Sequence, residues 1–225
     1  MANFAKIFTE NSEIFLIKKF IRIFERKVKQ TKKKRFSFVL AGGESPIYLY
    51  KELAKNKHLP WRKIDFFIGD ERYVNKNSKH SNIKMCKKYL LNKIKISNKQ
   101  IYAITTNQNS IKNDTLKYEK KIKNYFLNKK VIFDLILLGI GNDGHIASLF
   151  KKNIIEKNTK NVSYVKRKDL SRITLTLKCL NKSKSIFLWA PGKKTKIIKK
   201  ILSDKKFKYP VSFLKKKNNF LFYSN

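Results

Sequence analysis

The chain has 225 residues, of which 42% are hydrophobic, and this predicts a single α/β domain over residues 1–225. Its 54 Lys and Arg against 15 Asp and Glu give a formal net charge of +39 at pH 7. A basic nucleic-acid-binding protein is therefore one alternative. The lysines, however, are scattered over nearly every segment instead of forming one tail or patch, so we expect no specific nucleic-acid partner, and the basicity favours anionic metabolites.

The sequence indicates neither a membrane protein nor a metal-binding protein. The first apolar run, residues 14–24, is interrupted by Lys18, Lys19 and Arg22, and no signal-peptide pattern precedes it. Cys86 and Cys179 lie in unrelated contexts, without the paired spacing of a disulfide framework or a zinc site. We therefore expect a cytoplasmic protein, with no membrane partner, no bound metal and no cofactor.

Apolar residues in the first half of the chain alternate between helical and strand periods. The i, i+3, i+4 spacing over residues 14–28 predicts an amphipathic helix with Asn11 or Ser12 as N-cap. Short β-prone runs bounded by turn residues predict strands at 36–40, 64–68 and 101–104. Helices are predicted at 47–54, from a Ser81 N-cap onward, and at 111–126.

The second half repeats the alternation. Residues 133–139 form a nearly unbroken apolar run, typical of a strand buried on both faces in the middle of a parallel sheet. Further strands are predicted at 172–176, 186–190 and 220–223, and a helix at about 194–202. This order predicts an α/β fold with a doubly wound, mostly parallel, Rossmann-like sheet. Ligands of such sheets bind beyond the carboxyl ends of the strands, where the loops at Gly42, Asp70 and Asp143 should converge.

Two of these loops carry residues suited to an anionic ligand. Gly42 and Gly43 allow a close approach of the backbone, and Ser45 is predicted to cap the helix that Pro46 begins, so that amides at its N-terminus form a phosphate seat. Arg72, after Asp70 and Glu71, has a planar guanidinium that grips phosphate or polarises a carbonyl. An ordinary capped turn and a solvated charge cluster are the respective alternatives.

The third loop is the most informative. Gly139, Gly141 and Gly144 match the G-x-G-x-x-G spacing of dinucleotide-binding loops. They lie deep in the chain, however, and no following strand presents a carboxylate, so we reject that interpretation. Asp143 and His145 place a carboxylate and an imidazole two residues apart, which suits a general base; a structural loop histidine is the alternative.

These loops, in this order, resemble the 6-phosphogluconolactonase family, which is related to the glucosamine-6-phosphate deaminases. The resemblance runs from Leu40-Ala-Gly-Gly-Glu-Ser-Pro46 through Phe67-Ile-Gly-Asp-Glu-Arg72-Tyr-Val74 and Ser81-Asn82 to residues 133–150, then Arg172-Ile-Thr174 and Gly192 with its lysines. Family members hydrolyse 6-phosphogluconolactone to 6-phosphogluconate in the oxidative pentose phosphate pathway. The resemblance implies the same phosphorylated sugar lactone as substrate, without metal or cofactor, and we expect a monomer.

The resemblance also implies roles for individual residues. His145 is expected to deprotonate the attacking water, and Asp143 to orient the imidazole or contact sugar hydroxyls. Arg72 and Arg172 are candidates to stabilise the oxyanion. The phosphate is expected on Gly42, Gly43 and Ser45, with Arg72 or Arg172 and a lysine after Gly192. Counting back from the apolar helix residues favours Lys194 as that lysine, and Lys196 is the alternative.

Two positions differ from the patterns of related proteins, one in the phosphate pocket and one beside the histidine. Glu44 stands where the family has a small hydroxyl residue, and a carboxylate there repels phosphate unless it is paired or points away. The deaminases place a glutamate five residues after the histidine, where this chain has Phe150. A deaminase is therefore the rival prediction, and Phe150 favours the lactonase. The other histidines, His58 and His80, lack such surroundings, and we expect them at the surface.

Overall fold

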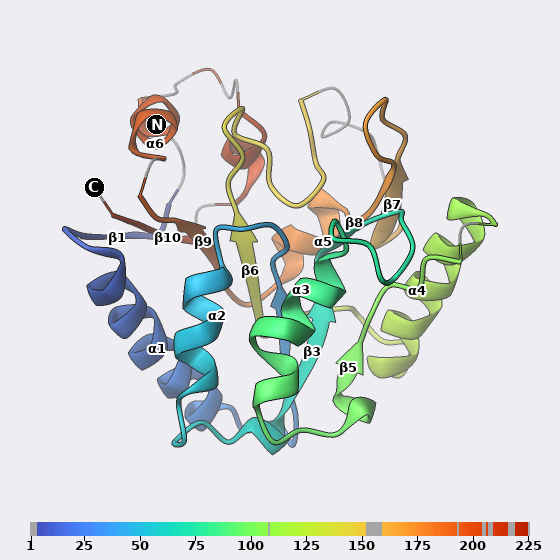
Figure 1. Cartoon of the computed structure of the whole chain (residues 1–225), viewed down its shortest axis with the longest axis horizontal. Helices are drawn as coiled ribbons and strands as arrows, with labels where there is room; N and C mark the ends of the chain where they lie inside the picture. Colours follow the sequence, from blue (N-terminus) through green and yellow to red (C-terminus); the bar gives the residue numbers. More distant parts are fainter. Residues whose placement is uncertain are drawn as a thin grey trace.

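The central sheet has seven strands and every pairing within it is parallel. The computed structural model describes residues 4–107, 109–151, 159–192, 194–203, 206, 209–215 and 219–224. In these residues the strand order is β1-β10-β9-β6-β2-β3-β5 (Figure 1). The strands are β1 (Lys6–Glu10), β2 (Phe36–Leu40), β3 (Ile64–Ile68), β5 (Ile101–Tyr102), β6 (Leu135–Gly139), β9 (Ile186–Ala190) and β10 (Asn219–Ser224). The predicted α/β class is confirmed.

Helices cover both faces of this sheet, and Figure 1 shows α1, α2 and α3 in front of it. The α-helices are α1 (Glu13–Gln30), α2 (Ile47–Ala54), α3 (Asn82–Tyr89), α4 (Ile111–Tyr125), α5 (Leu177–Lys182) and α6 (Thr195–Leu202). Phe24 of α1 packs on Phe38, whose ring is near that of Phe66, whereas Tyr125 of α4 packs on Phe67. Adjacent residues of a strand point to opposite faces, so α1 and α4 lie on opposite sides and the sheet is doubly wound.

The strand order puts a topological switch point between β2 and β6. From β2 the chain moves through β3 to β5 at one edge, and from β6 it moves through β9 to β10 toward the other. β6 is the fourth of the seven strands, and four of its five residues are buried, which confirms the central strand predicted from the apolar run at 133–139. The loops after β2 and β6 are the glycine turn and the histidine loop, and they therefore flank the position where open α/β sheets bind ligands.

A second, antiparallel sheet lies beside the first, and the sequence did not predict it. Its strands are β4 (Asp70–Arg72), β8 (Arg172–Leu175) and β7 (Val162–Val165). The predicted strand at 172–176 exists as β8, but it pairs with β4 and β7 and does not join the central sheet. Asp70–Arg72 is therefore a strand and not a loop. Three- and four-residue strands are too short to carry a period that distinguishes them from a turn.

Other local predictions need correction. β1 and α5 were not predicted, because an edge strand that is only partly buried and a helix of six residues show little apolar periodicity. The strand expected at 101–104 spans only Ile101–Tyr102. The N-cap of α2 is Pro46 and not Ser45, since the Ile47 amide bonds to the Glu44 carbonyl in a turn before the helix. None of the described helices is both long and apolar enough to cross a membrane.

Candidate active site

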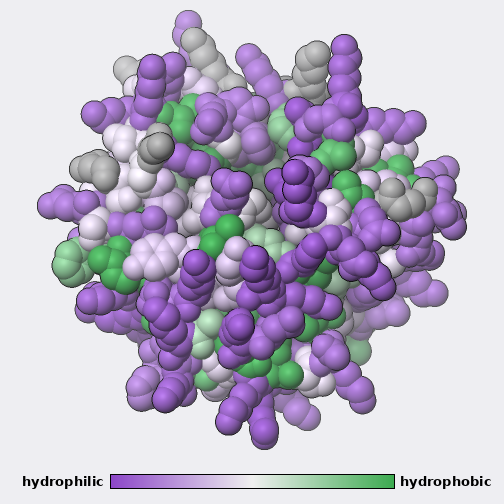
Figure 2. Space-filling model, in the orientation of Figure 1, coloured by the Kyte–Doolittle hydropathy of each residue, from purple (hydrophilic) through white to green (hydrophobic). Residues whose placement is uncertain are grey.

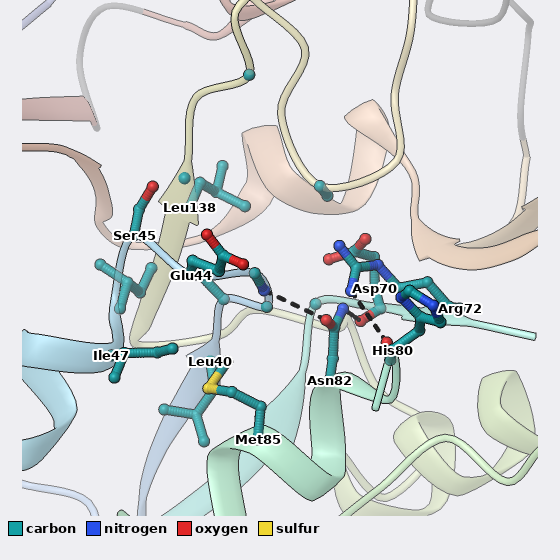
Figure 3. Close-up of a pocket in the computed structure, with 18 of the residues that line it drawn as sticks. Leu40, Glu44, Ser45, Ile47, Asp70, Arg72, His80, Asn82, Met85 and Leu138 are labelled. Carbon is teal, nitrogen blue, oxygen red and sulfur yellow. Dashed lines mark hydrogen bonds between the residues drawn. The ribbon is translucent and has the colours of Figure 1, made fainter. Parts of the chain in front are cut away.

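A cavity of about 770 Å³ opens at the carboxyl ends of β2, β3 and β6. Six residues predicted for the site line it: Gly42, Gly43, Ser45, Arg72, His145 and Lys194. Figure 3 shows Glu44 and Ser45 on one side of this cavity and Asp70 and Arg72 on the other, with Asn82 between them. Asp143 and Arg172, also predicted for the site, are not among the lining residues.

The His145 imidazole is held by Asp143. Its Nδ1 lies 2.5 Å from the Asp143 Oδ1, and the His145 backbone amide donates to the same oxygen at 3.1 Å. Partial burial raises the pKa of Asp143, but the hydrogen bonds from His145 outweigh it and bring the pKa below its ordinary value. In the neutral imidazole that donates from Nδ1 to this ionised carboxylate, Nε2 carries the free electron pair. This arrangement suits a general base.

The loop that carries His145 depends on two glycines. A Cβ on Gly141 would lie 2.1 Å from the His145 Nδ1 and 2.9 Å from the Asp143 Oδ1, so only glycine admits the folded-back imidazole. The Gly141 amide donates to the His145 carbonyl at 2.8 Å, which closes the loop. Gly144 has a φ of +78°, in the left-handed region that favours glycine. The G-x-G-x-x-G spacing here serves the histidine loop.

The two arginines predicted for the site have different surroundings. They lie opposite each other in the β4–β8 pairing. Arg72 lines the cavity, and its Nη1 donates to the His80 carbonyl at 2.9 Å (Figure 3). Arg172 instead donates to Asp169 at 2.9 Å, and its guanidinium lies 5.6 Å from the centre of the Phe150 ring. The geometry therefore favours Arg72 as the arginine that faces a ligand in the cavity.

The glycine turn offers donors, but not from every amide. The Gly43 amide donates to the Asn82 Oδ1 at 3.3 Å, so it is already engaged. Within the described residues, the amides of Glu44 and Ser45 donate to no protein acceptor. The Ser45 carbonyl is anchored by the Trp189 Nε1 at 3.0 Å. Both residues line the cavity, so two amides without a protein acceptor lie beside the N-terminus of α2, where an anion is favoured.

Of the two candidate lysines after Gly192, the structure brings Lys194 to the cavity. Its Nζ donates to the Ile140 carbonyl in the histidine loop, and burial lowers the pKa of its ammonium group. Lys196 is exposed on α6 and does not line the cavity. Glu44, in contrast, does line it and is exposed, so a carboxylate shares the cavity with the cations. His80 is exposed, as expected, and also lines the cavity.

Comparisons with known proteins identify the family of this chain. The family model described as glucosamine-6-phosphate isomerases/6-phosphogluconolactonase matches residues 12–222. The chain belongs to this family. Among its curated members, the 6-phosphogluconolactonase of Thermotoga maritima is 35% identical over 193 residues, 84% of each chain. That of Synechocystis is 34% identical over 185 residues, 79% of this chain and 77% of the relative.

Solved structures of the family share the fold over nearly the whole chain. The crystal structure of the Thermotoga maritima 6-phosphogluconolactonase superposes with a TM-score of 0.86 at 29% identity, covering 98% of this chain and 99% of that one. The 6-phosphogluconolactonase from Trypanosoma cruzi gives a TM-score of 0.86 at 26% identity, covering 100% and 96%. The predicted family and the predicted fold class are confirmed.

Two contacts in this family member were not predicted as parts of the site. Asn82, noted only in the resemblance, bridges the glycine turn and β4. Ser148 donates from Oγ to the Asp70 Oδ2 at 2.7 Å and ties the histidine loop to β4. The sequence signal for Ser148 is a lone hydroxyl within an apolar run, since buried hydroxyls require a partner. Among the described residues, no three His, Cys, Asp or Glu side chains are grouped as metal ligands.

Proposed function

We propose that this chain hydrolyses 6-phosphogluconolactone to 6-phosphogluconate, as the names of its relatives indicate for them. The observation that carries the proposal is the imidazole of His145, held by Asp143 and lining a cavity that Arg72 and Lys194 also line. A base beside cations is what hydrolysis of an anionic ester requires.

His145 is the general base of this reaction. Its Nε2 takes a proton from water as the water oxygen adds to the lactone carbonyl carbon. The tetrahedral intermediate then expels the ring oxygen, which receives that proton from the imidazolium, and the new carboxylic acid ionises to solvent. Asp143 keeps Nδ1 protonated and stabilises the imidazolium, since its carboxylate accepts the 2.5 Å hydrogen bond.

The cations and the glycine turn bind the charged parts of the substrate. Arg72 is the candidate to stabilise the oxyanion, because its guanidinium lies in the cavity and is anchored on the His80 carbonyl. The amides of Glu44 and Ser45 and the ammonium group of Lys194 are candidates to hold the phosphate. Arg172 enters this proposal only as a predicted ligand, because Asp169 holds its guanidinium.

The test is the rate of 6-phosphogluconate formation above spontaneous opening of the lactone. His145→Ala is expected to lower kcat by about 10² to 10⁴, the usual contribution of a general base. Asp143→Asn is expected to lower kcat less, by about 10 to 10², because the base remains but loses the charged acceptor that orients it. His58→Ala is the matched control, an exposed histidine outside the cavity. Wild-type hydrolysis at the buffer rate would refute the proposal.

The same purified protein can be used to test the deaminase alternative. Phe150 occupies the place where the deaminases have glutamate, and its ring centroid lies 4.6 Å from that of His145. The imidazole therefore packs against an apolar ring at this position and not against a carboxylate. Ammonia release from glucosamine 6-phosphate would assign the chain to the deaminase branch. Salt-dependent retention on DNA or RNA would instead support the basic nucleic-acid-binding alternative.

A monomeric state and a cytoplasmic location complete the proposal. Both cysteines, Cys86 and Cys179, are free and buried, which suits a reducing compartment. Light scattering after size exclusion tests the monomer directly, and localisation of a tagged chain tests the compartment.

A further inference from the structure

Asn82 connects three segments beside the cavity, namely the glycine turn, β4 and α3. Its Oδ1 accepts from the Gly43 amide at 3.3 Å, and its Nδ2 donates to the Asp70 carbonyl at 2.7 Å (Figure 3). Asn82 is also the first residue of α3, and only 2% of its surface is exposed. One amide therefore spans the space between the glycine turn after β2 and the strand β4.

Gly42 leaves the space that the Asn82 side-chain amide occupies. A Cβ on Gly42 would lie 2.1 to 2.2 Å from the three terminal atoms of the Asn82 side chain. Real Cβ atoms do not approach other atoms so closely, so a side chain at position 42 would displace the amide. The glycine is consequently explained by contact with Asn82, in addition to any approach of a phosphate to the backbone.

Asn82 is itself fixed by the buried carboxylate of Glu71. This carboxylate accepts from the amides of Asn82 at 2.7 Å and Ile83 at 2.9 Å, and from the Ser81 hydroxyl at 3.2 Å. It also accepts from the Arg72 amide at 2.9 Å. Glu71 therefore holds the start of α3 and the backbone of Arg72 at one point, and Asn82 extends that connection to the glycine turn.

We propose that Asn82 is a positioning residue, which keeps the phosphate-binding turn at a set distance from Arg72; this rests on the proposed lactonase function. Asn82 acts through the backbone it holds, since both ends of its amide bond protein groups. The His145 loop does not contact Asn82 directly: the Gly141 amide closes it, and Ser148 ties it to the side chain of Asp70, whose carbonyl Asn82 holds. Loss of Asn82 should therefore weaken substrate binding more than it slows the chemical step.

The first experiment compares Asn82→Ala with Asn161→Ala. Asn161 is also buried and donates from Nδ2 to Glu119 at 2.9 Å, but it does not line the cavity. Asn82→Ala is expected to raise KM about tenfold and to change kcat by less than about threefold, because two backbone groups lose their partner. Asn161→Ala is expected to lower stability and leave both constants unchanged. Asn82→Asp, nearly isosteric, keeps the acceptor and loses the donor, and should also raise KM.

A double-mutant cycle with Gly42→Ala separates positioning from a general loss of stability. Alone, Gly42→Ala should raise KM as Asn82→Ala does, because its Cβ displaces the amide. In the Asn82→Ala protein the same change should add little, since those three atoms are gone. Independent, multiplying effects on KM would overturn the inference. So would an unchanged KM in Asn82→Ala accompanied by the stability loss of Asn161→Ala.

Calorimetric titration with 6-phosphogluconate distinguishes failure of this inference from failure of the proposed function. If the wild type binds 6-phosphogluconate without hydrolysing the lactone, the proposed function fails. The positioning role then stands if the Kd for 6-phosphogluconate rises in Asn82→Ala and in Gly42→Ala but rises little further in the double variant. It is refuted if the Kd of these variants equals that of the wild type. A wild type that neither hydrolyses nor binds overturns both.

Discussion

Two glycines of the site are explained by the side chains that fill the space beside them. Gly42 admits the Asn82 amide, and Gly141 admits the His145 imidazole, each with a hypothetical Cβ only 2.1 Å from the neighbouring side chain. Each neighbour is a residue with a role in the proposed site. At this scale glycine acts through its missing Cβ. Because the packing is close, adding even one methyl group at either glycine would displace the neighbouring side chain.

Glu44 provides a test of electrostatics at single-residue scale. Its carboxylate lines the cavity that is proposed to bind a phosphate. Glu44→Ser is therefore expected to lower KM about threefold to tenfold at low salt, because a like charge near the phosphate is removed. Steady-state kinetics at two ionic strengths measures the change, which should shrink as salt is added.

Glu52→Ser is the matched control for Glu44→Ser. Glu52 lies on the adjoining helix α2, forms an ion pair with Lys55 and does not line the cavity. It changes the net charge by the same amount. An equal fall in KM for both variants would mean that overall charge, and not the position of Glu44, is responsible.

At the scale of elements, a carboxylate from the neighbouring strand β4 holds the start of the helix α3. Glu71 of β4 accepts hydrogen bonds from two backbone amides and one hydroxyl at this end, where the helix leaves amides without partners. The Ser81 hydroxyl also caps the helix, accepting from the Lys84 amide at 3.3 Å, which confirms the predicted cap. These hydrogen bonds therefore connect β4 to the start of α3 beside the cavity.

This carboxylate predicts a pH dependence of stability. Burial raises the pKa of Glu71 from 4.5 to about 6, against the hydrogen bonds from Ile83, Asn82 and Arg72, and the neighbouring Asp70 charge adds to the rise. Since the pKa is higher in the folded protein, the folded state binds more protons between these values. The contribution of Glu71 to the free energy of unfolding therefore falls as pH rises through this range, by about 2 kcal/mol above pH 6.

Glu71→Gln isolates this contribution from those of the other acids. The free energies of unfolding of both proteins are measured in urea from pH 4 to pH 7. Their difference should change between the unfolded and folded pKa values of Glu71 and become level above the folded value. A difference that is constant across the range would contradict the assignment. The Gln variant should be less stable overall, because its amide nitrogen faces backbone donors.

At the scale of the whole molecule, the hydrophilic side chains are dispersed over the surface, whereas the hydrophobic side chains gather in one core. Figure 2 shows hydrophilic side chains spread over the entire visible face, as the scattered lysines of the sequence indicated. Beneath them, one hydrophobic cluster extends from Phe4 to Phe222 and includes residues from both ends of the central sheet. Within the described residues the core is one continuous cluster, and this favours folding as one cooperative unit.

We expect one unfolding transition for the single domain proposed over residues 1–225. The chain has two tryptophans, Trp61 beside β3 and Trp189 on β9, in different parts of the sheet. Fluorescence of Trp61→Phe and Trp189→Phe proteins, each with one remaining reporter, should give the same denaturant midpoint as circular dichroism of the same sample. Separate midpoints for the two reporters would indicate two units.

The sequence alone determined what depends on neighbours along the chain. Apolar periods of 2 and 3.6 predicted the central strands and their helices, with β2 and β3 matching to the residue, because burial imposes these periods locally. The glycines around Asp143 and His145 likewise predicted a tight loop with a base. A contact two residues apart needs no knowledge of the rest of the fold.

Only the tertiary structure decided which distant residues meet. Arg72 and Arg172 are equivalent in the sequence, and the antiparallel pairing of β4 with β8, with Asp169 beside Arg172, turns one toward the cavity and holds the other outside it. The sequence already favoured Lys194 over Lys196, and the structure places Lys194 at the cavity, just before α6 begins. Asn82 reaches the proposed site because α3 starts beside the turn after β2 and the first residue of β4. Such choices depend on strand register and crossing, which arise from packing across the whole sheet and leave no local pattern.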